Sequence, residues 1–158
     1  MNKIASFTVN HLNLLPGVYV SRRDYIGSEV VTTFDLRFTR PNLEPPMDNP
    51  GIHSIEHLVA TFLRNHAEWA EKTIYFGPMG CQTGFYLLVR DMEPKEVFEL
   101  TKKILKQTIE HDGDVFGKSA IECGHYENLD IDLAKEECRT YLEVLENQTN
   151  MEFTYPTE

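Results

Sequence analysis

Long apolar runs are missing from this sequence of 158 residues, and so is an excess of positive charge. No stretch approaches the roughly 20 consecutive apolar residues that cross a bilayer, and the first residues lack the apolar core of a signal peptide. Fifteen Lys and Arg stand against twenty-five Asp and Glu, and the resulting formal net charge of −10 repels nucleic-acid phosphates and anionic lipid. We therefore expect a cytoplasmic protein that binds neither nucleic acid nor membrane.

Cysteine is also scarce, because the chain has only Cys81, Cys123 and Cys138. An odd number of cysteines in a chain long enough to form its own core argues against a disulfide framework. A functional cysteine is then expected to be a reactive thiolate or a metal ligand. The sequence has no internal repeat and no glycine-rich turn between a strand and a helix, so a dinucleotide-binding fold is not expected.

The apolar patterns predict strands that pair through turns, with helices between them. In residues 29–38, alternate side chains from Val30 to Phe38 share one face, while Asp35 and Arg37 lie on the other. The predicted strands are 17–22, 29–38, 73–77 and 85–90, with a short edge strand at 119–124, and the predicted helices are about 50–70, 94–111 and 130–147. The tail to Glu158 is expected to be loose. These elements predict an α+β fold, in which a mainly antiparallel sheet packs against helices in two layers, as a single domain over residues 1–158.

The strongest chemical signal is the segment His53-Ser54-Ile55-Glu56-His57. Two imidazoles four residues apart on a helix point the same way and can bind one metal ion. Glu56 lies about 60° around the helix from His53, where its carboxylate can move protons, as in H-x-x-E-H metallopeptidases. The alternative is a pair of solvated or core-edge histidines, but the pair lies away from the apolar stripe of the helix and near its start, which favours a metal site.

A third ligand is needed, and the cysteines are candidates. Cys138 shares a helical stripe with apolar residues and is expected in the core. Cys123 precedes Gly124 at a predicted strand end, and Cys81 lies in a turn bracketed by glycines, so either could bind metal. Two histidines and one cysteine would leave a coordination position open, which is typical of catalytic sites.

Four ordered motifs resemble the S-ribosylhomocysteine lyase (LuxS) family over nearly the whole chain. They are residues 34–38, residues 53–57, residues 77–84 and the pair Cys123-Gly124. The resemblance implies a homodimer with active sites at the subunit interface, each holding one divalent metal, natively ferrous iron, with zinc or cobalt as alternatives. Carried over by motif, the metal ligands are His53, His57 and Cys123, the acid–base pair is Glu56 and Cys81, and the substrate pocket is lined by Ser6, His11 and Arg37.

The family's reaction cleaves S-ribosylhomocysteine to homocysteine and 4,5-dihydroxy-2,3-pentanedione, a signal precursor, by carbonyl migration and β-elimination. Two other hypotheses stay open: an H-x-x-E-H metallopeptidase, which would not need Cys81, and a non-catalytic zinc module closed by a fourth ligand. His125 is expected near the surface or behind the ligands rather than as that fourth ligand. Arg37 has a second interpretation as well, a solvent-exposed ion pair with Asp35.

Overall fold

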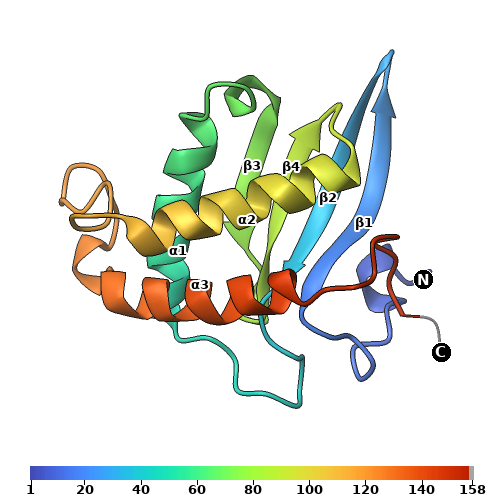
Figure 1. Cartoon of the computed structure of the whole chain (residues 1–158). Coiled ribbons are helices and arrows are strands. Elements are labelled where there is room, and N and C mark those ends of the chain that lie inside the picture. The colour runs from blue at the N-terminus through green and yellow to red at the C-terminus, as the bar shows by residue number, and fades with distance from the viewer. Residues whose placement is uncertain (157–158) are drawn as a thin grey trace.

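A computed structural model describes residues 1–156 as one antiparallel sheet covered on one face by three α-helices (Figure 1). The strands are β1 (Gly17–Ile26), β2 (Glu29–Arg37), β3 (Thr73–Pro78) and β4 (Gly84–Arg90), in the sheet order β1-β2-β4-β3. The helices are α1 (Asn49–Arg64), α2 (Pro94–Glu110) and α3 (Ile131–Glu146), with short 3-10 turns at Ala5–Phe7, Ala70–Lys72 and Tyr126–Asn128. The predicted α+β fold with a helical layer and a sheet layer is confirmed.

The core lies between the sheet and the helices, as the alternation in β2 predicts. Phe34 and Leu36 of β2 are buried there with Phe85 and Leu87 of the neighbouring strand β4. Ile55, on the apolar stripe of α1, meets them from the helical layer. Burial of each such side chain contributes roughly 1.5–3 kcal/mol to the stability of the folded state. The apolar stripe therefore determines which side of α1 faces the sheet, and the remaining side is available for a functional site.

The helix ends follow local sequence signals. Glu93 and Glu96 form a capping box at the start of α2, and Asp130 caps α3 by accepting the backbone N–H groups of Asp132 and Leu133. No helix among residues 1–156 has the length and apolarity that a membrane span requires.

The helix predicted to reach residue 70 ends earlier, at Arg64. The ring nitrogen Nδ1 of His66 accepts hydrogen bonds from the backbone N–H groups of Glu68 and Trp69, with N···N distances of 3.1 and 3.3 Å. A side chain that bonds to nearby backbone in this way stabilises a turn in place of a further helical turn.

Three other predictions need correction. β1 runs on to Ile26, because Gly27 at φ +63° forms a tight hairpin with β2. Residues 119–124 form turns rather than an edge strand, with the N–H of Cys123 bonded to the carbonyl of Ser119. The described part of the tail is anchored through Phe153, which is only 1% exposed between the exposed residues 149–152 and 154, while residues 157 and 158 lie outside the described chain.

Candidate metal site and reactive thiol

His53 and His57 lie on the flank of α1 that the apolar stripe leaves free. Their ring centroids are 4.8 Å apart, and both residues are half-buried. One helical turn separates them, so their rings project toward the same region, as the sequence predicts. Glu56 is half-buried between them on the same helix.

Each imidazole is oriented by a bond from its Nδ1. The Nδ1 of His53 lies 2.8 Å from Asn128 Oδ1, and that of His57 lies 2.8 Å from the carbonyl oxygen of Phe116. A carbonyl oxygen can only accept, so this bond requires a proton on Nδ1 of His57, and in that neutral tautomer Nε2 is the nitrogen available to a metal. This is how metal-binding histidines are usually held.

Gly117 lets the loop after α2 approach His57 this closely. Its φ is +72°, and a Cβ there would lie 3.2 Å from His57 Nδ1. Glycine avoids both the crowding and the cost of a left-handed backbone.

Cys123 completes the group from the loop between α2 and α3. Its Sγ lies 3.3 Å from His53 Nε2, and the ligand atoms of His53, His57 and Cys123 all lie within 4.8 Å of one another. The loop is fixed to α1 because the hydroxyl of Ser54 accepts the N–H of Asp130 at 2.7 Å. Cys123, which the spacing alone could not separate from Cys81, is therefore the cysteine beside the histidine pair.

These three donors suit a divalent transition metal. Imidazole nitrogen and thiolate sulfur are ligands of zinc and of iron, and three protein ligands leave a position open for another molecule. His125 is exposed and is not part of the group, although its backbone N–H points at Cys123 Sγ from 3.4 Å. Among residues 1–156 the structure supplies three ligands for a possible metal site.

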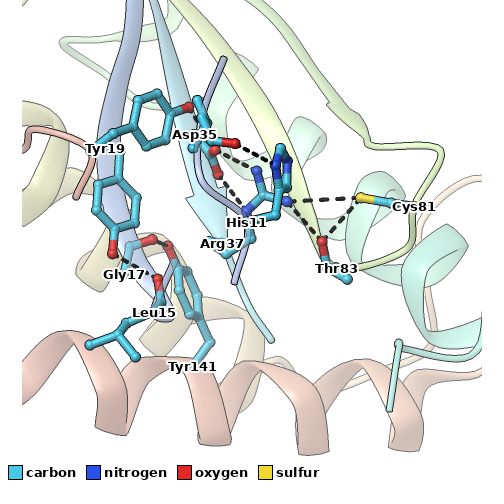
Figure 2. Close-up of polar contacts among 11 residues, drawn as sticks. His11, Leu15, Gly17, Tyr19, Asp35, Arg37, Cys81, Thr83 and Tyr141 are labelled. Carbon is cyan, nitrogen blue, oxygen red and sulfur yellow. Dashed lines mark hydrogen bonds and ion pairs between the residues drawn. The ribbon is translucent and has the colours of Figure 1, made fainter. Parts of the chain in front are cut away.

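Cys81 lies elsewhere, exposed in the turn that joins β3 to β4. Its Sγ is 3.1 Å from the hydroxyl of Thr83 and 3.8 Å from Nη1 of Arg37 (Figure 2). Gly84 closes the turn where a Cβ would lie only 2.4 Å from the carbonyl oxygen of Leu36. The turn therefore presents an accessible thiol beside a guanidinium.

Arg37 is buried, so its alternative interpretation, a solvent-exposed ion pair with Asp35, is wrong about the surroundings of the pair. Arg37 is 3% exposed and Asp35 is 0% exposed, yet both lie on the sheet face opposite the helices. The guanidinium binds both carboxylate oxygens, at 3.1 and 2.6 Å, and Nη1 also donates to Thr83 at 2.8 Å. Burial lowers the pKa of the Arg37 guanidinium. The charge of the Asp35 carboxylate and its hydrogen bonds raise the pKa by more, so the net shift is upward.

We expect the Arg37→Leu variant to be much less stable than the unmodified protein. It would leave the carboxylate of Asp35 buried without its cation, which typically costs about 3–5 kcal/mol. The free energy of unfolding, measured with urea, tests this. The double variant Asp35→Leu/Arg37→Leu should recover most of the loss, and an equally unstable double variant would show that the charge pair is not the cause.

Cys138 is a core residue, as its helical stripe predicts. It is 0% exposed, and burial raises the pKa of its thiol to about 12. Ser6 and His11 are half-buried in the N-terminal segment. In the described chain His11 Nδ1 contacts the carbonyl oxygen of Val9 at 2.9 Å, and neither residue bonds to Cys81 or to the histidine pair.

Comparison with known proteins identifies the family of this chain. The family model for S-ribosylhomocysteinase (LuxS) matches residues 4–152. The chain belongs to the LuxS family. Proteins named S-ribosylhomocysteine lyase from Clostridium beijerinckii and Finegoldia magna are 51% and 50% identical to it, each over 99% of both chains. A protein of the same name from Phocaeicola vulgatus is 46% identical over 100% of this chain and 99% of its own.

Sequence reasoning missed several residues that support the site in this LuxS chain. Asn128 and the carbonyl of Phe116 orient the histidines, Thr83 contacts Cys81, and Tyr155 binds Asp35. None shares a motif or a regular spacing with the residue that it supports. The alternation in residues 29–38 places Asp35 on the face away from the helices, so it does not show that this carboxylate is buried and needs a partner.

We expect the Asn128→Leu variant to bind divalent metal about 10–100-fold more weakly, as is typical when an outer-shell partner of a histidine ligand is lost. A competition titration with a chromophoric chelator measures the affinity. Asn128→Asp, which keeps an acceptor for His53, should bind near the unmodified level. Equal affinity in Asn128→Leu would contradict an orienting role for the amide.

Proposed function

We propose that this chain is a metal-dependent carbon–sulfur lyase that cleaves S-ribosylhomocysteine to homocysteine and 4,5-dihydroxy-2,3-pentanedione. The observation that carries the proposal is the convergence of two imidazoles and one thiol within 4.8 Å in a LuxS-family chain. The single lyase domain would span residues 1–158. The product would serve as the precursor of an intercellular signal, as in quorum sensing, and homocysteine would return to methionine metabolism.

His53, His57 and Cys123 would hold one divalent ion, ferrous iron in the cell, with zinc or cobalt as substitutes. When bound, such an ion supplies Lewis-acid stabilisation of the negative charge that develops on a sugar oxygen as a neighbouring carbon loses its proton. The Nδ1 contacts to Asn128 and Phe116 hold the two rings in place for that task.

The chemistry left to the side chains is proton transfer. The open-chain sugar has its aldehyde at C1 and its thioether at C5, so the carbonyl must first move to C3. Each move takes a proton from the next carbon and returns one to the former carbonyl carbon, through an enediolate. Loss of the C4 proton then expels homocysteine thiolate from C5, and protonation of the resulting enol at C5 gives the diketone.

Two groups would share these transfers. We assign Cys81 to the early isomerisation and Glu56 to the later steps, because general acid–base catalysis on two sides of a carbon chain needs two groups. The guanidinium of Arg37 presents positive charge to Cys81 Sγ at 3.8 Å, which is complementary to a thiolate. Arg37, Ser6 and His11 would line the substrate pocket.

The active enzyme would be a homodimer with its sites at the interface. The N-terminal segment supports this, because Ile4, Phe7 and Leu12 are each more than half exposed there. An apolar surface of this kind is typical of contacts between proteins. We place the enzyme in the cytoplasm, where its three free cysteines would stay reduced.

Anaerobic incubation of the iron-loaded protein with S-ribosylhomocysteine tests the proposed function. We expect one free thiol and one dicarbonyl product for each substrate consumed, at a catalytic rate. A folded, metal-loaded protein that releases no thiol would contradict the proposal.

A further inference from the structure

The C-terminal tail reaches the reactive thiol through two buried side chains. Tyr155 donates its hydroxyl proton to Asp35 Oδ2 at 2.7 Å, and the same oxygen accepts Nη2 of Arg37 at 2.6 Å. The other end of the guanidinium, Nη1, contacts Thr83 and Cys81 (Figure 2). A continuous set of polar contacts thus joins residue 155 to residue 81.

The tail is held firmly enough to serve as a fixed support. Phe153 is 1% exposed with its ring 5.6 Å from that of Phe98, and its carbonyl oxygen accepts the N–H of Val20 at 2.8 Å. Its φ of +56° is costly for a residue with a side chain, so this burial and this bond must offset a strained backbone. The tail is therefore docked against β1 and α2.

Tyr155 is placed by stacking as well as by its hydroxyl. Its ring lies 5.2 Å from that of Tyr19, with 17° between the two planes, and Tyr19 faces Asp35 across the β1–β2 pair. Burial, and then the charge of Asp35, raise the pKa of Tyr155, so the hydroxyl keeps its proton and stays a donor.

We propose that Tyr155 is a positioning residue for Cys81, acting through Asp35 and Arg37. Its hydroxyl fixes the rotation of the Asp35 carboxylate, and the carboxylate in turn holds the guanidinium with Nη1 toward Cys81 Sγ. Without the hydroxyl of Tyr155, Oδ2 of the fully buried Asp35 loses one of its hydrogen-bond donors. The carboxylate then rotates toward another donor. The guanidinium then spends less time against the sulfur. The inference rests on the proposed function only in taking Cys81 as the acid–base group.

The variant Tyr155→Phe tests this, because it removes one oxygen and keeps the stacked ring. On the metal-loaded enzyme, we expect kcat to fall about threefold to tenfold with KM unchanged, which is less than the loss of a direct bond to a charged group costs, because Tyr155 acts through Asp35 and Arg37. Alkylation of Cys81 by iodoacetamide, followed by peptide mass spectrometry, should slow by a similar factor. The melting temperature shows whether the variant is folded.

Tyr19→Phe is the matched control, since its hydroxyl donates to the carbonyl of Leu15 rather than to Asp35. It should leave both kcat and the alkylation rate of Cys81 unchanged. Unchanged alkylation and kcat in Tyr155→Phe would overturn the inference, and so would equal losses in both variants. An unmodified enzyme that releases no thiol would instead contradict the proposed function, because the alkylation rates do not depend on turnover.

Discussion

Replacing Cys81 by alanine should nearly abolish thiol release while leaving bound metal unchanged. The thiol lies in the β3–β4 turn, where its contacts are with Thr83 and Arg37 rather than with the histidine pair. Loss of a general acid–base group typically lowers the rate about 10²–10⁴-fold, so we expect kcat to fall by at least 10²-fold. Steady-state release of homocysteine, measured beside metal content, gives the result.

Cys138→Ala is the matched control for this experiment, because it also replaces a cysteine by alanine but does so in the core. It should keep its turnover and lose only some stability. If Cys81→Ala turned over at the unmodified rate, the assignment of Cys81 to proton transfer would be wrong.

Replacing Cys123 by alanine should differ from Cys81→Ala in one respect, the loss of the metal itself. The variant keeps two imidazoles but no thiolate, so affinity should fall by more than the roughly 10–100-fold that loss of an outer-shell partner costs. Thiol release should disappear with the metal. Metal content after dialysis, measured by atomic emission, checks this directly.

The comparison with Cys81→Ala gives this second experiment its control. Each variant removes one sulfur, yet only Cys123→Ala should lose the metal, because only Cys123 lies 3.3 Å from a ring nitrogen of His53. Full metal occupancy in Cys123→Ala would remove the sulfur from the ligand set.

Much of the fold was predictable because its signals are local. The alternation in β2 and the apolar stripe of α1 each set which side is buried, and the start of α3 follows from the cap at Asp130. The end of α1 was not predictable in this way. It depends on the ring of His66 bonding to two backbone N–H groups, and helical periodicity carries no sign of that.

The site was predictable in part. Spacing brings His53 and His57 together, because one helical turn is a local property. The choice between Cys81 and Cys123 is a different matter, since it depends on which of two loops, distant in the sequence, packs against α1. The bond between Asp130 and Ser54 and the close approach of Gly117 decide it, and both depend on tertiary contacts.

The burial of Arg37 also depends on tertiary contacts that local sequence patterns do not predict. Period-two alternation places Asp35 and Arg37 on the sheet face away from the helices, which is solvent-exposed in many antiparallel sheets. Here Tyr155 of the tail and Tyr19 of β1 contribute to a cover over that face, so the pair is buried. Tyr155 and Asp35 are more than 100 residues apart in the sequence. The pattern around Asp35 therefore carries no sign of the tail that covers it.

X-ray absorption spectroscopy at the edge of the bound metal tests the proposed ligand set directly. We expect one ion per chain with two imidazole nitrogens and one sulfur, at about 2.0–2.1 and 2.3 Å for zinc. The sulfur signal should be absent in Cys123→Ala and kept in Cys81→Ala. A coordination sphere without sulfur, or one with a second sulfur from Cys81, would contradict the proposed ligands His53, His57 and Cys123.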